Sequence, residues 1–232
     1  MDSLHRPYRA LVVGATGTIG SAFVRALAGR PGCEAVTSLS RLTHASFDLE
    51  DPESIGRAAR YAVDEGPFAL IIDATGVLAT EPAGPEKSLT ALQERSFQRI
   101  MQINALGPML LLRALTPAIA EGRSIYGKLS ARVGSISDNR LGGWYSYRAS
   151  KAALNMLLQT AAIELHRRRP QLIMAALQPG TVRSPLSERF LGQRTDLVLP
   201  DQAAVGLLDA LDGLPAGPGA SFIDYRGQTI AW

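Results

Sequence analysis

The sequence has few of the residues that build metal centres and disulfide frameworks. Among its 232 residues there are one cysteine, Cys33, and three histidines, His5, His44 and His166. A single thiol excludes an internal disulfide and a thiolate cluster, which fits a reducing compartment, and the histidines are too dispersed to suggest a zinc site. We therefore expect no bound metal and a cytoplasmic location.

Long hydrophobic runs and a strong excess of one charge are also missing. No apolar stretch reaches the roughly 18 residues of a membrane-spanning helix, and the first apolar run leads into a glycine turn instead of a signal-peptide cleavage site. The net charge is +3, and the basic cluster Arg167-Arg168-Arg169 ends a predicted helix, where the negative end of the helix dipole favours cations. We expect neither a membrane nor a nucleic-acid partner, with a nucleic-acid patch at these arginines as the alternative.

What the sequence does have is a regular alternation of short apolar runs and segments of helical periodicity. Hydrophobic residues make up 46% of the chain and charged residues 19%, as in globular proteins. The patterns predict strands at 8–13, 34–40, 68–73, 124–130, 172–177 and 220–224. They predict helices at 21–28, from 51 onward, at 92–120 with a kink at Pro108, from the Tyr147 region to about 169, and at 202–211.

Strands alternating with helices predict an α/β fold of the Rossmann type, a doubly wound parallel sheet with helices on both faces. In such a sheet, ligands bind at the carboxyl ends of the strands. No shift in composition and no internal repeat marks a boundary, so residues 1–232 are expected to form one domain.

Gly14, Gly17 and Gly20 directly follow the first predicted strand. Glycines at such positions allow a tight turn, a close approach of the backbone to a pyrophosphate, and close packing of helix on strand. The amides at the start of the next helix would bind the phosphates. The spacing differs from the usual Gly-x-Gly-x-x-Gly of dinucleotide folds, which leaves a purely structural turn as the alternative.

The second predicted strand ends in Ser38-Leu39-Ser40-Arg41. About 20 residues beyond the glycine turn, an NAD-binding unit would present an acidic residue to the ribose 2′-hydroxyl. Here there is no acid, and Arg41 stands where a 2′-phosphate would need a cation with paired donors. The sequence therefore predicts that NADP(H) is preferred over NAD(H). A solvated loop arginine is the alternative.

Tyr147 and Lys151 are four positions apart in a predicted helix and therefore share one face. A tyrosine with its ordinary pKa of about 10 is a poor acid or base at neutral pH. A neighbouring ammonium can lower such a pKa by about 1–3, which would make Tyr147 useful in proton transfer. A half-exposed tyrosine beside a solvated lysine is the alternative.

Together these features resemble the short-chain dehydrogenase/reductase family over nearly the full length of the chain. The matching motifs, in order, are the glycine turn 14–20, Asp48-Leu49, Asp73-Ala74-Thr75-Gly76 in place of the usual Asn-Asn-Ala-Gly, Asn104, Tyr147-x-x-x-Lys151, and Pro179-Gly180-Thr181-Val182-Arg183-Ser184. The segment 129–139, followed by Gly142-Gly143-Trp144, further resembles the C-factor-like and sniffer-like branch near the carbonyl reductases.

The resemblance implies roles for the matching residues. Tyr147 would exchange a proton with the substrate oxygen while hydride moves to or from the nicotinamide. Lys151 would hold the nicotinamide ribose and depress the pKa of the tyrosine. Asn104 would anchor a water in a proton relay, or else close a helix kink at Gly107-Pro108. The implied cofactor contacts are Gly14, Thr16, Gly17, Thr18, Ile19, Gly20, Ser40, Arg41, Asp48, Leu49, Ala74, Thr75, Gly76, Asn104, Tyr147, Lys151, Pro179, Gly180, Val182 and Ser184.

One part of the family pattern is missing. The catalytic serine is usually the second residue of a Ser-Ser pair, and here the pair is Ser130-Ala131. Strand side chains alternate in direction, so Ser130 is expected to face away from the site. Ser135 is our predicted replacement, with Ser137 close by. Loss of an oxyanion donor can cost a factor of about 10²–10³ in rate.

The predicted function is an NADPH-dependent oxidoreductase that interconverts a small-molecule carbonyl and an alcohol. The first alternative is an NAD(P)-binding signalling or regulatory protein of the C-factor type with little turnover, and the second is a sugar-nucleotide epimerase. Residues 183–200 are expected to form a lid, and Leu141, Trp144 and Tyr145 to line an apolar pocket. A homodimer or homotetramer through the two long helices is expected from the resemblance.

Overall fold

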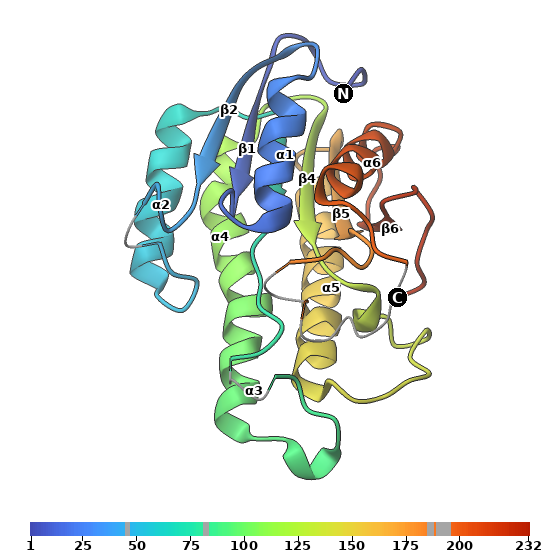
Figure 1. Ribbon diagram of the computed structural model, residues 1–232. Helices are drawn as coiled ribbons and strands as arrows, with labels where there is room; N and C mark the ends of the chain where they lie inside the picture. Colours follow the sequence, from blue (N-terminus) through green and yellow to red (C-terminus); the bar gives the residue numbers. More distant parts are fainter. Residues whose placement is uncertain (45–46, 81–83, 185–187, 189–195) are drawn as a thin grey trace.

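Six parallel strands form one sheet in the computed structural model, which describes residues 1–44, 47–80, 84–184, 188 and 196–232 (Figure 1). The strands are β1 (Tyr8–Val13), β2 (Cys33–Leu39), β3 (Leu70–Asp73), β4 (Ser124–Leu129), β5 (Leu172–Gln178) and β6 (Ser221–Asp224). Their order is β2-β1-β3-β4-β5-β6, and every neighbouring pair is parallel. The winding reverses at β1, which confirms the predicted doubly wound sheet.

Helices connect consecutive strands and cover both faces of the sheet. They are α1 (Thr18–Ala28), α2 (Pro52–Glu65), α3 (Glu94–Met101), α4 (Gly107–Leu115), α5 (Tyr145–His166) and α6 (Pro200–Asp212). Short 3-10 turns, η1 (Leu89–Ala91), η3 (Thr116–Ala118) and η4 (Arg132–Gly134), and a π-helical segment, η2 (Gln102–Leu106), complete the described elements. The boundaries differ from the predicted ones by a few residues, as expected where turn and helix merge.

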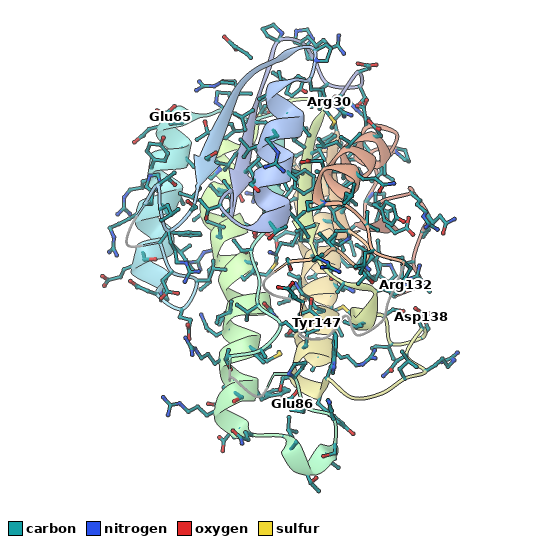
Figure 2. All side chains as sticks on the ribbon, in the orientation of Figure 1. Arg30, Glu65, Glu86, Arg132, Asp138 and Tyr147 are labelled. Carbon is teal, nitrogen blue, oxygen red and sulfur yellow. The ribbon has the colours of Figure 1, made fainter. Side chains whose placement is uncertain are left out.

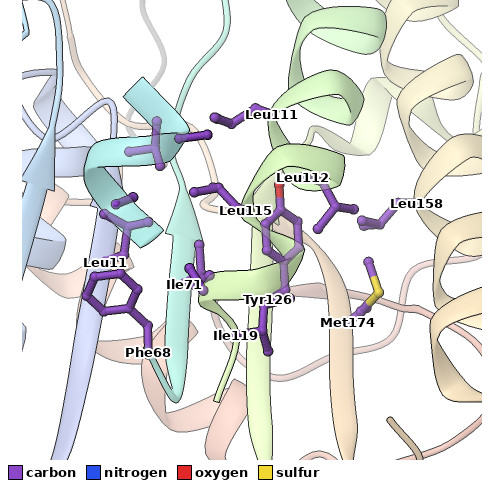
Figure 3. Packing of buried hydrophobic residues seen from close by; sticks show 14 of the residues in the cluster. Leu11, Phe68, Ile71, Leu111, Leu112, Leu115, Ile119, Tyr126, Leu158 and Met174 are labelled. Carbon is purple, nitrogen blue, oxygen red and sulfur yellow. The ribbon is translucent and has the colours of Figure 1, made fainter. Parts of the chain in front are cut away.

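The alternation of side chains along β1 explains the two layers of the core. Leu11 and Val13 pack with residues of α2, α4 and α5, and Figure 3 shows this layer. Ala10 and Val12 point to the opposite face and pack with residues of α1 and α6. Because successive strand residues face opposite sides, a central strand that is apolar at every position must be buried on both.

The predicted helix over 92–120 differs from the structure in its middle and at its end. Pro108 has no amide hydrogen, so it cannot donate to the carbonyl four residues earlier, and its ring crowds that carbonyl. The chain accommodates this with the π-helical η2 directly ahead of α4, in which Pro108 is the second residue. Pro117 lies in η3, after which Ile119 forms a parallel bridge with Phe68. The π-helical segment matters for the site because it carries Asn104.

Candidate active site

The carboxyl ends of four strands meet at one edge of the sheet. Val13 of β1 pairs with both Leu39 of β2 and Asp73 of β3, and Asp73 pairs in turn with Lys128 of β4. The loops that follow these strands contain most of the predicted site residues. The reversal of winding at β1 places the glycine turn at the point where a doubly wound sheet binds its ligand.

The glycine turn packs too tightly for side chains at two of its positions. Gly14 has φ +75°, and a Cβ on Gly20 would lie 2.1 Å from the carbonyl oxygen of Gly14. The turn leads into α1, whose N-cap Gly17 supplies no side-chain hydrogen bond. The amides of Thr18, Ile19 and Gly20 therefore keep the orphan donors and the positive dipole end that favour a phosphate. Thr16 is exposed beside them.

Arg41 lies on the surface just beyond the end of β2. Ser40 is buried, and its hydroxyl accepts hydrogen bonds from the amides of Leu42 (3.2 Å) and Thr43 (3.3 Å), which builds the turn that carries Arg41. In the described part of the chain, the Arg41 guanidinium has no hydrogen-bond or ion-pair partner. It is free to bind an anion.

Asp48 and Leu49, the residues expected near the adenine, lie between this turn and η2. The Asp48 carboxylate accepts a hydrogen bond from the Glu50 amide (2.9 Å). Leu49 is buried, and its carbonyl accepts one from the Gln102 side chain (3.2 Å). These contacts join the adenosine side of the predicted site to the π-helical segment.

The turn after β3 lies against Asn104. Asn104 is fully buried, and its side chain bonds both backbone groups of Val77: Oδ1 accepts from the amide, and Nδ2 donates to the carbonyl, each at 2.8 Å. Nδ2 also donates to Ser150 Oγ at 3.0 Å, and that hydroxyl donates to the carbonyl of Tyr147 at 2.8 Å. Ala74, Thr75 and Gly76 lie in this turn. Asn104 thus ties it to the helix of the predicted proton donor.

Lys151 is buried, and Tyr147 is partly buried beside it. Lys151 is 3% exposed, and its ammonium donates to the carbonyl of Leu129 (3.2 Å) and lies 5.7 Å from the centroid of the Tyr147 ring. Burial lowers the pKa of Lys151 to about 7; the like charge of Lys128 adds to this, and Asp73 opposes it. A lysine with such a pKa gains or loses its proton near neutral pH.

Burial also acts on Tyr147, whose pKa it raises to about 12. The prediction that Lys151 depresses the pKa of Tyr147 is therefore wrong. The reason is that desolvation disfavours both the phenolate and the ammonium, and the ammonium faces the ring centroid and the Leu129 carbonyl. In this structure the phenol remains protonated at neutral pH.

Glu86 caps the helix that carries Tyr147, and no sequence pattern revealed it. Its carboxylate accepts hydrogen bonds from the Ser146 amide (3.2 Å) and from the Ser146 hydroxyl, and its carbonyl accepts one from the Trp144 amide (2.5 Å). Trp144 has φ 54°, so the chain turns sharply before α5. Figure 2 shows Glu86 near the start of α5, on the same side as Tyr147. A capping residue far away in the sequence leaves no local signal.

The serines after β4 differ in their surroundings. Ser130 is buried and donates to Asn155 Oδ1 (2.6 Å), so its hydroxyl is already engaged. Ser135 is 1% exposed; its hydroxyl accepts from the Asp138 amide (3.2 Å) and lies 3.4 Å from Ser137 Oγ. Ser137 donates to the carbonyl of Trp232 (2.9 Å).

The loop that contains Ser135 packs against α5 at Gly134. An ion pair between Arg132 and Asp138 (3.3 Å) spans this loop (Figure 2). A Cβ on Gly134 would lie 2.8 Å from Lys151 Cβ, so the backbone next to Ser135 touches the helix at Lys151. The residue before Ser135 therefore touches α5 at Lys151 and Ala152, one turn after Tyr147.

The segment after β5 returns to the start of α1. Pro179 is buried, and Gly180 has φ +80°. Val182 pairs with Val198, and Ile19 at the start of α1 packs against the hydrophobic cluster that contains them. Ser184 follows in the same segment. The predicted contacts at 179–184 thus lie beside the predicted phosphate site.

The structure describes part of the expected lid and all three residues of the expected apolar pocket. Residues 185–187 and 189–195 of the expected lid lie outside the described residues. Leu141 is 93% exposed and Tyr145 is exposed, whereas Trp144 is partly buried, with its ring 6.1 Å from that of Tyr147. Of the three expected pocket residues, Trp144 is the one in contact with the tyrosine.

Two further features bear on the class of protein. Among the described residues, no group of three potential metal ligands comes together. None of the described helices combines the length and apolar character needed to cross a bilayer. The doubly wound sheet, the glycine turn at the start of a helix and the Asn104–Tyr147–Lys151 cluster are typical of dinucleotide-binding α/β proteins. Tyr147 and Lys151 lie at the end of the site away from the glycine turn.

Comparison with known proteins identifies the family. The family model for short chain dehydrogenase matches residues 8–194, so the chain belongs to the short-chain dehydrogenase family of oxidoreductases. It is similar to the 1-hydroxy-2-glutathionyl-2-methyl-3-butene dehydrogenase of Rhodococcus sp. (strain AD45), with 31% identity over 186 residues, covering 80% of this chain and 78% of the relative. The C-signal of Myxococcus xanthus is 32% identical over 179 residues, covering 76% and 99%.

Solved structures agree at the level of the fold. The NADPH-bound carbonyl reductase from chicken fatty liver superposes with a TM-score of 0.85 at 24% identity, covering 98% of this chain and all of the other. The carbonyl reductase Sniffer of D. melanogaster gives a TM-score of 0.79 at 19% identity, with the same coverage. The match to C-signal confirms the predicted resemblance to the C-factor-like branch, and the solved carbonyl reductases show the shared fold.

Proposed function

We propose that the protein is an NADPH-dependent oxidoreductase that interconverts a small-molecule carbonyl and an alcohol. The observation that carries the proposal is the cluster of buried Asn104 and Lys151 with partly buried Tyr147, at the same sheet edge as the glycine turn. One end of this edge suits a dinucleotide phosphate, and the other presents a phenol whose proton can be transferred.

Tyr147 is the proposed proton donor in the reducing direction. Bound NADPH would supply the hydride. The raised pKa of Tyr147, about 12, keeps its hydroxyl protonated at neutral pH, ready to donate to a substrate oxygen. Lys151, whose ammonium donates to the Leu129 carbonyl, is the proposed residue that holds the nicotinamide ribose. Asn104 holds the turn 74–77 and is the proposed anchor for a relay water.

Ser135 is the proposed donor to the substrate oxygen in place of the hydroxyl missing at Ala131. Support comes from its burial and from the contact between the neighbouring Gly134 and Lys151. The hydroxyl accepts from the Asp138 amide, which leaves its own hydrogen free for a substrate oxygen or for Ser137.

Arg41 is the proposed reason for a preference for NADPH. Its guanidinium, exposed and without a partner among the described residues, follows β2, where a 2′-phosphate would need paired donors. The chicken carbonyl reductase, which shares the fold, is bound to NADPH. Affinities for NADPH and NADH, measured by calorimetry in the parent and in Arg41→Ala, test this. The variant should bind NADPH more weakly than the parent and bind NADH equally well. If the ratio of the two affinities were the same in parent and variant, the assignment of Arg41 would be contradicted.

A panel of aldehydes, ketones and quinones, assayed with NADPH by the loss of nicotinamide absorbance, tests the reaction itself. Consumption of NADPH that depends on a carbonyl compound supports the proposal. Binding of NADPH with no turnover across the panel would contradict it.

That second outcome would favour the alternative function, a signalling or regulatory protein that binds NAD(P) with little turnover. Two observations support this alternative: Ala131 in place of the usual serine, and the 32% identity to C-signal of M. xanthus. Against it stands the fully buried Asn104, bonded to the turn and to the helix of Tyr147, because binding alone needs no such arrangement.

We also propose that one domain spans residues 1–232 and that it forms a homodimer or homotetramer through α5. A single sheet joins strands from residue 8 to residue 224. On α5, Met156, Leu157 and Ile163 are 67%, 40% and 43% exposed, an apolar face at helical spacing. Light scattering on the parent and on Met156→Glu tests this: the variant should have the smaller mass, and a monomeric parent would contradict it.

A further inference from the structure

Lys128 is a charged residue at the centre of the sheet for which the proposed reaction has no direct use. Its side chain, like that of Asp73 on the neighbouring strand, has no exposed surface. The ammonium donates to Asp73 Oδ1 (3.0 Å), to the carbonyl of Thr75 (2.6 Å) and to Thr75 Oγ1 (3.0 Å). An ammonium has three donors, so these contacts use its whole capacity.

Stability alone is a weak reason to keep such a pair. The free energy needed to remove two charges from water offsets much of their mutual attraction. Well-packed apolar residues can therefore replace a buried ion pair without a loss of folding stability. Asp73 and Lys128 are direct partners in the register of β3 and β4. The acid at 73, where the family usually has asparagine, is therefore matched by a cation on the adjacent strand.

The turn that Lys128 holds connects the two ends of the proposed site. On one side, a Cβ on Gly14 would lie 3.1 Å from the carbonyl carbon of Ala74, so this turn packs against the glycine turn. On the other side, a Cβ on Gly76 would lie 3.3 Å from both Asn104 Oδ1 and Lys151 Nζ. The turn 73–77 is thus wedged between the phosphate-binding backbone and the proton-transfer residues.

Hydrogen bonds continue from Lys128 toward Tyr147. Asp73 Oδ1 accepts from the amide (2.9 Å) and hydroxyl (2.6 Å) of Thr75, which closes the first half of the turn. Val77, at the other end of the turn, is bonded by Asn104, and Asn104 is bonded through Ser150 to the backbone of Tyr147. Lys128 itself binds the carbonyl of Thr75, which lies midway along the turn between Asp73 and Val77.

We propose that Lys128 is a positioning residue: by binding Asp73 and Thr75, its ammonium fixes the turn 73–77 for the cofactor and holds Asn104 in register with Tyr147. The inference rests on the proposed function, because it assigns Lys128 to the same site. Lys128 acts through Thr75 and Asn104 and does not itself touch the reacting atoms.

Two double variants separate this role from stability. Lys128→Met alone would leave a buried, unpaired carboxylate, so each double variant also carries Asp73→Asn. Asp73→Asn/Lys128→Met removes both charges and the donor to Thr75. Asp73→Asn/Lys128→Gln has a side chain of nearly the same size whose amide can still donate to the Thr75 carbonyl. Arg25→Met/Asp201→Asn, which removes an exposed ion pair between α1 and α6, is the control.

Thermal unfolding, NADPH affinity by calorimetry, and kcat on a responsive carbonyl compound are measured for each protein. We expect all to fold. The methionine variant should bind NADPH about tenfold more weakly and have a kcat about tenfold lower, the factor expected for one lost hydrogen bond to a charged group. The glutamine variant should recover most of both losses, and the control should match the parent.

Folded methionine and glutamine variants with parental affinity and kcat would overturn the inference. So would failure of either to fold, because the pair would then serve stability. A parent that binds NADPH but reduces nothing contradicts the proposed reaction, and NADPH affinity still tests the turn. A parent that does not bind NADPH overturns both.

Discussion

The two ends of the site are built in opposite ways. At the glycine turn, the groups available to a ligand are backbone amides, and the nearby side chains of Thr16, Arg41 and Asp48 are exposed. At the other end, Asn104, Ser135 and Lys151 are buried, and each is hydrogen-bonded to another part of the chain: to Ser150, to the Asp138 amide and to the Leu129 carbonyl. One end is an open backbone surface, and the other is a desolvated polar cluster.

The difference teaches where each property of the site comes from. Backbone amides at the start of a helix bind anions whatever side chains surround them. The affinity for a phosphate therefore depends on the glycines that let the backbone form a tight turn and approach the ligand closely. In the buried cluster, desolvation is the largest cause of the shifts in pKa, upward for Tyr147 and downward for Lys151. We therefore expect changes at the open end to alter binding, and changes at the buried end to alter the rate.

Ser135→Ala should give the largest effect among the changes that sharpen this comparison. Removing a hydroxyl donor to the substrate oxygen is expected to lower kcat by about 10²–10³ and leave NADPH affinity unchanged. Steady-state kinetics with saturating NADPH measure it, and Ser137→Ala, whose hydroxyl is engaged by Trp232, is the matched control. Equal kcat values in parent and Ser135→Ala would remove Ser135 from the site.

Gly20→Ala should have the reverse effect, on binding. Its Cβ would lie 2.1 Å from the Gly14 carbonyl oxygen, so the backbone must shift. Overpacking of this kind costs about 1–3 kcal/mol, and we expect NADPH affinity to fall by about 10- to 100-fold. Calorimetry measures it. Gly29→Ala, with its nearest contact at 4.0 Å, is the control. If Gly20→Ala bound NADPH as tightly as Gly29→Ala, the turn would not be the phosphate site.

The low pKa of Lys151, about 7, predicts how stability depends on pH. Above that pH, the folded chain has released a proton that the unfolded chain keeps until its ordinary lysine pKa of about 10.4. Stability should therefore rise with pH, by up to about 1.4 kcal/mol per pH unit, and the lowered pKa of Lys128 acts in the same direction. Tyr147, with its pKa raised, opposes this only above about pH 10, where the unfolded tyrosine ionises first.

Urea unfolding at about pH 7 and about pH 8.5 checks this expectation. The gain in the free energy of unfolding between these two values should be smaller in Lys151→Met than in the parent. An identical gain in both proteins would mean that Lys151 titrates normally in the folded chain.

Glu86→Ala should give the smallest of the four effects. Loss of this cap on α5 is expected to cost about 1 kcal/mol of stability. It should also lower kcat several-fold, because the hydrogen bonds that fix Ser146, the residue before Tyr147, are lost. Thermal unfolding and steady-state kinetics measure both. Glu86→Gln keeps one acceptor oxygen for the Ser146 amide, and its NH2 group can donate to the Ser146 hydroxyl, so this variant should stay near the parent. Equal losses in the two variants would assign the effect to charge instead of the cap.

The open end could be predicted from the sequence because its function lies in spacing. Three glycines after an apolar run, followed by helical periodicity, are enough to predict a strand, a turn and a phosphate-binding helix start. The alternation of strands and helices likewise predicted the sheet, since each parallel strand needs a covering crossover. The structure confirms the strand, the turn, the helix and the sheet, whereas phosphate binding by the helix start stays a prediction.

The buried end could not be predicted to the same depth because it depends on contacts between distant residues. The sequence indicates Tyr147, Lys151 and Asn104 but not the π-helical segment that carries Asn104, the cap from Glu86, or the pairing of Lys128 with Asp73. Pairwise spacing suggested that Lys151 would depress the pKa of Tyr147. Desolvation, which depends on the whole fold, reversed the direction.

Tyr147→Phe tests the central claim, that the open end binds the cofactor and the buried end transfers the proton. NADPH affinity and carbonyl reduction are to be measured on the same preparations of parent and variant. We predict affinities within about twofold and a kcat lowered by about 10²–10⁴, the range for a lost general acid. A variant that reduces carbonyl compounds as fast as the parent would contradict the account.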